Sequence, residues 1–328
     1  MTGAEDVLVP SSAGPGARIF LRIRRAARGR GAPKPAILFI HGATVSGFVF
    51  DLDSAGASWL VGATAAGFDA AYLDLRGYGR STRPPEMGKP SPEGSPFCRA
   101  ADAAHDVDDA IGFLRRTLGV EKVHIVALSW GTIIAGIYLA SGSRPVERLA
   151  MVAPSFVNPN RAALIEIADP ADPSRFDARK GAWRLATAAG IEARWCQQIV
   201  GRDMDDWRDR AVGAAFLDAF SASDPDAATL DPPGVRVPNG VLVDAVEVYN
   251  GRPLYDPSRL RLPTLVVRGA EDPESTPLDA AGLFSLLGSR EKHYLVIGRA
   301  THFAIVERAG PRLLGEVLRF LDPSANGG

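Results

Sequence analysis

Cysteine is scarce in this chain of 328 residues, and its two copies lie far apart in the sequence. Neither Cys98 nor Cys196 belongs to a Cys-x-x-Cys pair or to the Cys/His spacings that metal and redox sites require. This excludes a metal or redox centre built on thiols. We expect both cysteines to be reduced residues that serve packing.

An excess of charge of either sign is also missing. The sequence has 37 Lys and Arg residues against 38 Asp and Glu residues, which gives a formal net charge of −1. Because binding to nucleic acid depends on Lys and Arg side chains that neutralise phosphates, this balance argues against a nucleic-acid partner. We expect the partner to be a small molecule instead.

Long hydrophobic runs are absent as well. No stretch approaches the roughly 18 consecutive apolar residues that a membrane-spanning helix needs. The N-terminal residues 1–10 lack the basic and then apolar regions of a secretory signal. The sequence therefore predicts no membrane partner and a soluble, cytoplasmic protein.

Short apolar runs rich in branched residues alternate with longer segments that have helical periodicity. This alternation is typical of the α/β class, in which βα units build a mostly parallel central sheet flanked by helices. The run Arg18–Arg24 instead alternates charged and bulky residues, as a half-exposed antiparallel strand near the start of the sheet would. The runs that predict buried strands are Ala36–Ile40, Ala70–Leu73, Val123–Leu128, Leu149–Val152, Thr264–Val267 and Tyr294–Ile297.

A different pattern fills the stretch between Pro154 and Pro263. Strand-like runs nearly vanish there, and helical turns rich in Arg and Asp replace them. We predict that residues 156–258 form a mostly helical insertion before the penultimate strand. Residues 1–155 and 259–328 then make up the core domain. The aromatic residues of the insertion include Trp183, Trp195, Trp207, Phe216 and Phe220.

Ser129 stands at a strand-to-helix junction that has no loop. The apolar run Val123–Leu128 precedes it, and an apolar helical segment follows it directly. Such a turn strains the serine backbone and exposes the hydroxyl group, and it requires small residues two positions to either side, because strand and helix nearly touch. Ala127 and Gly131 meet this requirement. Alternatively, Ser129 only caps the following helix, which is a common position for serine.

A serine hydroxyl becomes a good nucleophile only when a neighbouring base removes its proton. His302 follows the last predicted strand through a short loop, which can return the imidazole to the carboxyl edge of the sheet. A carboxylate that orients this imidazole can come from Glu271 or Asp272, which follow the strand before it. Three further histidines lie within predicted helices or strands, where packing or surface positions are expected, and these are His105, His124 and His293.

The order of these residues along the chain, Ser129, then Asp272, then His302, resembles that of the α/β-hydrolase superfamily, and the similarity covers residues 15–322. The family's pattern of a glycine, two further residues and an aspartate selects Asp272 over Glu271. The resemblance implies that Ser129 is the nucleophile, His302 the base, and Asp272 the acid that orients the base.

The segment His41-Gly42-Ala43 follows a predicted strand and is similar to the His-Gly turn of the same family. By that resemblance the backbone N–H groups of Ala43 and Trp130 form an oxyanion hole, and His41 is structural. The family inserts a cap domain where residues 156–258 stand in this sequence. The resemblance therefore implies that this segment covers the nucleophile and shapes the substrate pocket.

These residues suit acyl transfer, in which serine attacks a carbonyl and water then hydrolyses the acyl-enzyme. We expect a hydrolase that cleaves a carboxylic ester or lactone of a small, hydrophobic molecule. Four alternatives remain, namely a thioesterase, a hydrolase of C–C bonds, a prolyl-type aminopeptidase and a non-catalytic small-molecule receptor. The sequence shows no cluster of metal ligands and no Gly-x-Gly-x-x-Gly stretch after a strand, so neither a metal nor a cofactor is expected.

Overall fold

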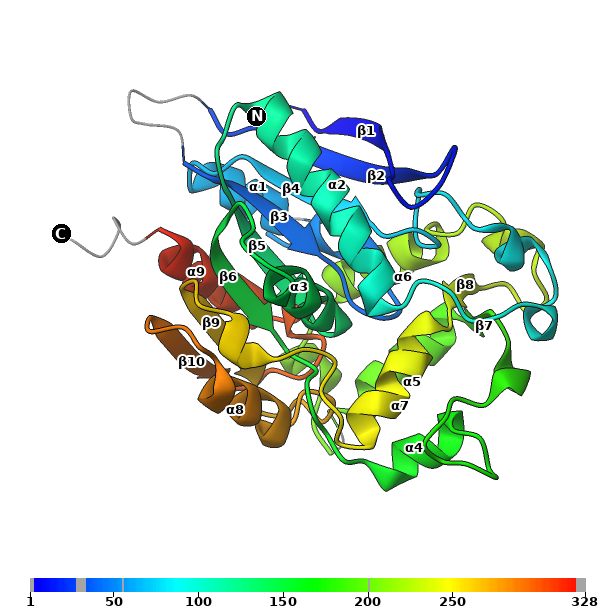
Figure 1. Ribbon diagram of the computed structural model, residues 1–328. Helices are drawn as coiled ribbons and strands as arrows, with labels where there is room; N and C mark the ends of the chain where they lie inside the picture. Colours follow the sequence, from blue (N-terminus) through cyan, green and yellow to red (C-terminus); the bar gives the residue numbers. More distant parts are fainter. Residues whose placement is uncertain (1–2, 28–33, 55, 200, 323–328) are drawn as a thin grey trace.

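One central sheet organises the chain (Figure 1). The computed structural model describes residues 3–27, 34–54, 56–199 and 201–322. Eight strands are hydrogen-bonded in the order β1-β2-β4-β3-β5-β6-β9-β10. The pairs β1/β2 and β2/β4 are antiparallel, and the other neighbours are parallel, so the predicted sheet is confirmed. The strands are β1 (Glu5–Pro10), β2 (Arg18–Arg24), β3 (Ala36–Ile40), β4 (Ala70–Asp74), β5 (Val123–Leu128), β6 (Val146–Val152), β9 (Thr264–Gly269) and β10 (Lys292–Ile297).

The sequence patterns missed the edges of this sheet more than its centre. β1 is an outer strand whose side chains are mostly exposed, so it has no buried apolar run to reveal it. β6 begins at Val146 and β10 at Lys292, both earlier than predicted, because polar residues at their starts interrupt the apolar runs. Every residue of β3 and β5 is buried, as expected for central parallel strands covered on both faces.

Helices cover both faces of the sheet. In Figure 1, α2 and α3 pack against each other in front of the sheet, whereas α1 and α9 contact each other behind it. None of the helices within the ranges given above is long and apolar enough to cross a membrane. The helices of the core are α1 (Trp59–Ala65), α2 (Ala100–Leu118), α3 (Trp130–Ala140), α8 (Pro277–Leu286) and α9 (Gly310–Leu321).

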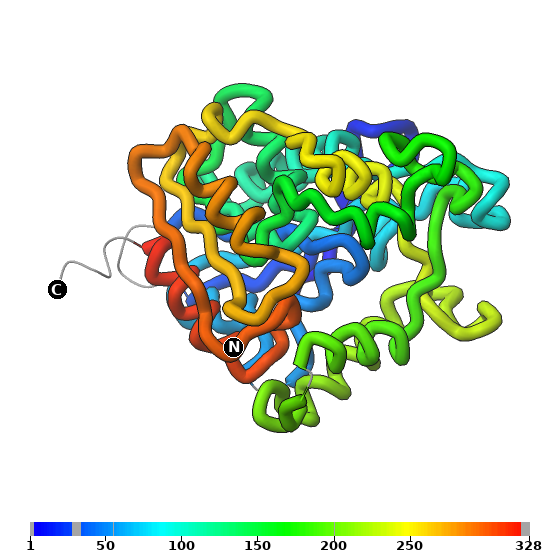
Figure 2. The backbone as a smooth tube through the Cα atoms, turned by 90° about the horizontal axis from the view of Figure 1, so that it is seen from below, coloured from blue at the N-terminus to red at the C-terminus, as the bar shows by residue number. Residues whose placement is uncertain are grey.

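The chain between β6 and β9 leaves the sheet and returns to it. It forms the right-hand side of the view in Figure 2, where it runs from green to yellow, and α9 lies at the left. Among its described residues, four α-helices make up most of the regular structure, together with two short antiparallel strands that the sequence did not predict individually. Each of these strands has only four residues, too few to give a clear alternation. The elements are α4 (Arg161–Ile167), β7 (Trp183–Ala186), α5 (Ala188–Gln197), α6 (Arg210–Ser221), β8 (Val235–Pro238) and α7 (Gly240–Tyr249).

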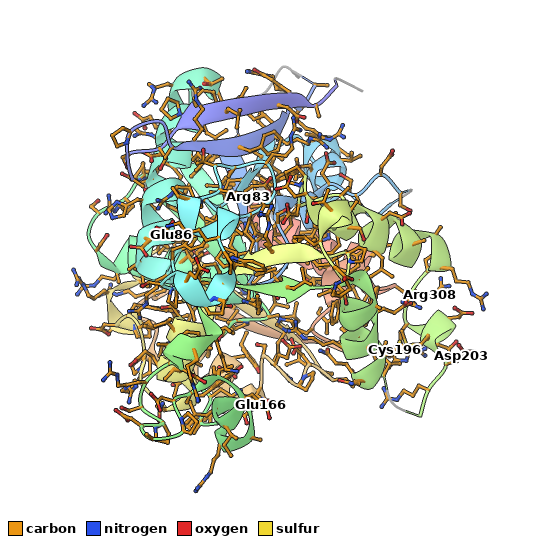
Figure 3. The ribbon with its side chains drawn as sticks, turned by 90° about the vertical axis from the view of Figure 1, so that its right-hand side faces the viewer. Arg83, Glu86, Glu166, Cys196, Asp203 and Arg308 are labelled. Carbon is orange, nitrogen blue, oxygen red and sulfur yellow. The ribbon has the colours of Figure 1, made fainter. Side chains whose placement is uncertain are left out.

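The two cysteines differ in their surroundings. Cys98 is buried in the core, in agreement with its predicted packing role. The same prediction is wrong for Cys196, which is exposed. It lies on the outer side of α5, in the same region as Asp203 (Figure 3), because the helix turns the neighbouring Trp195 into the core instead.

Candidate active site

Ser129 lies in a strained turn at the carboxyl end of β5. Its backbone has φ 54° and ψ −124°, a conformation with positive φ that residues with a side chain rarely adopt. The N–H of Ser129 donates to the carbonyl oxygen of Val152 at 2.9 Å, which ties the turn to β6. Helix α3 begins at the next residue, so the serine side chain projects from a fixed position above the sheet.

The two small residues beside Ser129 have different steric limits. A Cβ atom on Gly131 would lie 2.5 Å from the carbonyl oxygen of His41 and 2.8 Å from that of Ile40. Both contacts involve backbone that cannot move aside, so this position requires glycine. Ala127 is fully buried and pairs with Ile40 and Met151 in the sheet, where its methyl group fits.

We expect Gly131→Ala to destabilise the protein by about 2 kcal/mol or more, because α3 must move away from β3 to admit the methyl group. Gly315→Ala is the matched control, since Gly315 lies within α9 and a Cβ there would meet no atom within 4 Å. The control should gain up to about 1 kcal/mol from its better helix propensity. Urea unfolding of both variants measures the difference, and equal effects would contradict this account.

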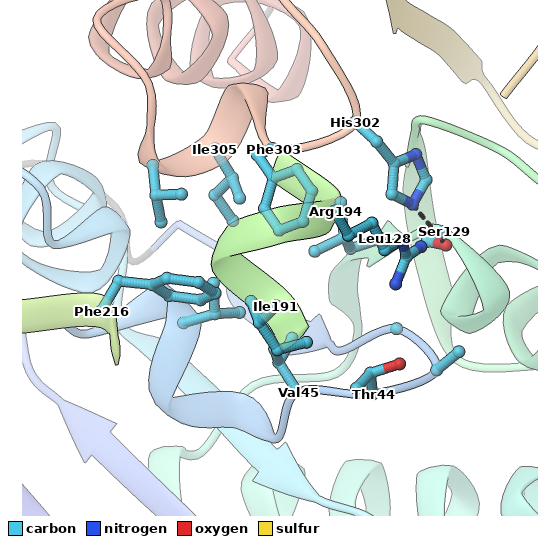
Figure 4. Close-up of a pocket in the computed structure, with 14 residues that line it drawn as sticks. Thr44, Val45, Leu128, Ser129, Ile191, Arg194, Phe216, His302, Phe303 and Ile305 are labelled. Carbon is cyan, nitrogen blue, oxygen red and sulfur yellow. Dashed lines mark hydrogen bonds between the residues drawn. The ribbon is translucent and has the colours of Figure 1, made fainter. Parts of the chain in front are cut away.

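His302 lies in the loop between β10 and α9, and its ring faces Ser129. The Nε2 atom of His302 is 2.9 Å from the Ser129 Oγ, within hydrogen-bond distance (Figure 4). The backbone N–H of His302 donates to the Oε1 of Gln198 at 3.0 Å. The preceding residue, Thr301, donates from its N–H and its hydroxyl to the buried Glu307. These bonds hold the loop at Thr301 and at the backbone of His302.

Asp272 lies on the far side of the imidazole from Ser129. Its two carboxylate oxygens are 3.0 and 3.1 Å from the Nδ1 of His302. The Oδ1 also accepts hydrogen bonds from the N–H groups of Glu274 and Ser275, which hold the carboxylate in place. Glu271, the other acid considered from the sequence, turns elsewhere, because its carboxylate accepts from the N–H of Ala300. The structure thus places the imidazole of His302 between the hydroxyl group of Ser129 and the carboxylate of Asp272.

Glu274 adds a second negative charge beside the imidazole. Its Oε2 is 3.6 Å from the Nε2 of His302, and Arg194 and Gln198 donate to the same carboxylate. Burial lowers the pKa of His302, but the charges of Asp272 and Glu274 outweigh burial and raise that pKa to about 9. The raised pKa also means that His302 stabilises the fold most below pH 6.5, and that this contribution is lost as pH rises through about 9.

Replacing Glu274 by glutamine should shift the pH profile of any reaction in which His302 acts as a base. Neutral imidazole is the active form, so kcat/KM of the native protein should rise as pH rises through about 9. Without the Glu274 charge the imidazolium is less stable, and the midpoint should fall to lower pH. Glu271→Gln removes the same charge from a residue that does not face the ring, and its midpoint should stay in place. An unchanged midpoint in Glu274→Gln would contradict the electrostatic role.

Ala43 and Trp130, the predicted oxyanion donors, flank Ser129 in space. Both line the same cavity as Ser129 and His302. Trp130 is the first residue of α3, where a backbone N–H has no acceptor within the helix. The carbonyl oxygen of Ala43 accepts from the hydroxyl group of Tyr78 at 2.9 Å, which holds the turn after β3.

His41 is fully buried and ties two loops together. Its Nε2 accepts a hydrogen bond from the N–H of Leu75 at 3.1 Å, and its Nδ1 lies 2.9 Å from the Gly42 carbonyl oxygen. The first bond requires an unprotonated Nε2, so the proton lies on Nδ1 and donates to that carbonyl. Burial lowers the pKa of His41 to about 4, which keeps the ring neutral. This agrees with the structural position expected for it.

Two cavities meet at Ser129, and we call them the apolar lobe and the polar lobe. The apolar lobe has a volume of about 60 Å³, and Phe216 and Ile305 lie at its end away from Ser129 (Figure 4). The polar lobe is larger, about 280 Å³. Both are lined by Ala43, Thr44, Ser129, Arg194 and His302. The apolar lobe adds Gly42, Val45, Val49, Leu128, Ile191, Phe216, Phe303, Ile305 and Val306. The polar lobe adds the polar or charged residues Ser155, Asn158, Arg184, Tyr249 and Glu274, and also the apolar residues Trp130, Ile133, Val241, Leu242, Ala245 and Val248.

Several polar residues around Ser129 escaped the sequence analysis. Arg184, Arg194 and Gln198 come from the insertion, where no pattern distinguishes a pocket residue from a surface residue. Glu274 carried a weak signal, since it is an acid two positions after Asp272 in a loop expected near the site. Among the described residues, no three His, Cys, Asp or Glu side chains are grouped so that they could hold a metal ion.

Comparison with known structures gives the same fold in several hydrolases. An enol-lactonase from Burkholderia xenovorans is 17% identical, with 95% of this chain and 99% of that chain covered and a TM-score of 0.62. An esterase from Exiguobacterium antarcticum is 12% identical, with 97% of this chain and 99% of that chain covered and a TM-score of 0.64. A thioesterase domain of the curacin biosynthetic pathway is 15% identical, with 97% of this chain and 98% of that chain covered and a TM-score of 0.58.

Sequence comparison points to one family. No curated protein matches the chain in sequence. The family model described as the alpha/beta hydrolase fold, however, matches residues 35–309, which is most of the chain. The protein therefore belongs to the alpha/beta hydrolase fold family.

Proposed function

We propose that the protein is a serine hydrolase that cleaves a carboxylic ester or lactone of a small molecule. Membership of the family supports a hydrolase. The observation that carries the finer proposal is the line of hydrogen-bond contacts from Ser129 Oγ through the His302 ring to Asp272. A hydroxyl, an imidazole and a carboxylate in this arrangement are the parts that nucleophilic acyl transfer needs.

The reaction starts with proton transfer from the Ser129 hydroxyl to Nε2 of His302 as Oγ bonds to the substrate carbonyl carbon. Asp272 holds the imidazole with its proton on Nδ1 and stabilises the imidazolium that forms. His302 then gives its proton to the departing alcohol oxygen as the C–O bond breaks. Water repeats the sequence on the acyl-enzyme and releases the acid, so one ester and one water give one acid and one alcohol.

The tetrahedral intermediate carries a negative charge on the former carbonyl oxygen. We assign the stabilisation of this charge to the backbone N–H groups of Ala43 and Trp130. Loss of one such donor typically lowers the rate by about 10²- to 10³-fold. Tyr78 supports this role indirectly, because its hydroxyl group fixes the carbonyl side of Ala43.

Residues 156–258 serve as the cap in this proposal. Ile191 and Phe216 of this segment line the apolar lobe, and Asn158 and Tyr249 line the polar lobe. Two lobes that meet at the nucleophile suit the two sides of an ester bond. The small apolar lobe favours a short hydrophobic group on one side, and the larger lobe accepts a more polar group on the other.

A substrate panel tests the proposal against three of the alternatives, the thioesterase, the aminopeptidase and the receptor. The native protein should hydrolyse 4-nitrophenyl esters or simple lactones much faster than thioesters or prolyl amides of 4-nitroaniline. Faster turnover of thioesters or of prolyl amides would replace the proposal by a thioesterase or an aminopeptidase. Stabilisation by esters in thermal unfolding without any turnover would favour a receptor.

A further inference from the structure

Arg184 of β7 presents a cation in the polar lobe without a charged partner. Its Nη1 donates to the carbonyl oxygen of Pro238 at 3.0 Å and to the side-chain oxygen of Asn239 at 3.4 Å. Its Nη2 donates to the carbonyl oxygen of Ala43 and the hydroxyl of Thr44, both at 3.4 Å. All four acceptors are neutral. In the part of the chain that the structure describes, no carboxylate lies within ion-pair distance of Arg184.

Several other arginines near the interior are paired with acids, whereas the buried Arg268 donates to the backbone carbonyl oxygens of Ser275 and Asp272. Arg194, which lines the same lobe, is paired with Glu274, and Arg236 is paired with Asp224. Burial lowers the pKa of Arg184 from its ordinary value, as expected for a desolvated cation without a counter-ion. Arg194 is paired with Glu274 and His302 with Asp272, so Arg184 is a lining cation that has no acid beside it among the described residues.

We propose that the substrate carries a carboxylate group that binds Arg184 in the polar lobe, while its ester bond lies at Ser129. This inference rests on the proposed function, because it names the substrate class of the same site. A guanidinium offers its N–H donors in a planar fork that matches a carboxylate. Three of the four present bonds of Arg184 are 3.4 Å long, and a carboxylate can replace them with charge-assisted bonds of about 2.8 Å.

An alternative role for Arg184 is to hold the turn after β3, but this role does not explain its long hydrogen bonds. The Ala43 carbonyl oxygen already accepts the hydroxyl group of Tyr78 at 2.9 Å, which is shorter than its 3.4 Å contact with Arg184. The polar lobe also contains Asn158, and it has room for a small acid in its volume of about 280 Å³. A half-ester of a short dicarboxylic acid, or a lactone that bears an acid group, fits these features.

Two esters of equal length provide the kinetic test. 4-Nitrophenyl hydrogen adipate ends in a carboxylate, and 4-nitrophenyl hexanoate ends in a methyl group. Arg184→Gln should lower kcat/KM for the adipate ester by about 10- to 100-fold, and for the hexanoate ester by only about 3-fold or less. Arg184→Lys should fall between the native protein and Arg184→Gln. Arg179→Gln is the control, because Arg179 is an exposed arginine already paired with Asp177, and it should change neither rate.

Equal losses on both esters in Arg184→Gln would assign Arg184 a positioning role and overturn the proposal. A second measurement stays decisive even if neither ester is turned over or the Arg184 variant does not fold. In Ser129→Ala, calorimetry should show that 4-nitrophenyl hydrogen adipate binds about 10-fold or more tightly than 4-nitrophenyl hexanoate, which has no free carboxylate. Equal binding of the two esters would refute the carboxylate site. Failure of turnover with preferential binding of the adipate ester would refute only the proposed hydrolysis.

Discussion

Replacing Ser129 by alanine should lower ester hydrolysis by about 10⁴-fold or more, because the substitution removes the hydroxyl group that attacks the carbonyl in the proposed mechanism. The change removes one oxygen atom that is 2.9 Å from His302 Nε2. The backbone of the turn and both lobes stay the same, so ligands should still bind. Single-turnover kinetics with an activated ester measures the loss directly.

Ser141→Ala is the matched control for this variant. Ser141 follows the last residue of α3 and is exposed, so its hydroxyl cannot reach the site. Its rate should equal that of the native protein. Turnover by Ser129→Ala at more than a few per cent of the native rate would mean that another residue or a bound water performs the attack.

Asp272→Asn should lower kcat by about 10⁴-fold. The native carboxylate accepts the Nδ1–H of His302, which leaves Nε2 free to take the serine proton. An asparagine amide can instead donate to Nδ1, and the imidazole then carries its proton on Nε2, where it cannot act as a base. The variant also removes the main charge that raises the pKa of His302.

Glu271→Gln separates this effect from a general change of charge in the loop. Glu271 precedes Asp272 directly, but its carboxylate accepts from Ala300 rather than from the imidazole. We expect its rate to stay within about 3-fold of the native rate, as for a surface substitution. A greater loss in Glu271→Gln than in Asp272→Asn would exchange the roles of the two acids.

The centre of the fold was readable from the sequence because burial on both faces leaves continuous apolar runs. β3 and β5 are fully buried and match their predicted bounds. β1 was missed because it is an outer strand with mostly exposed side chains, and β7 and β8 were missed because each has only four residues and lies outside the main sheet. Cys196 was misplaced for a related reason, because composition alone does not tell which side of α5 faces solvent.

Some residues of the candidate site could also be predicted from the sequence, and others could not. Ser129 and His302 follow recognisable strands, so their approach could be predicted from the parallel topology. Choosing Asp272 over Glu271 depended on a family resemblance, and the geometry now places Asp272 against the ring. The positions of Arg184 and Glu274 in the site could not be predicted, because they depend on contacts between segments that are distant in the sequence.

The most direct test of the account is intact-mass analysis after treatment with a fluorophosphonate, which labels activated serines. We expect one adduct on the native protein, no adduct on Ser129→Ala, and an adduct on Ser141→Ala. The absence of an adduct on folded native protein, or an adduct that persists in Ser129→Ala, would contradict the claim that His302 and Asp272 activate Ser129.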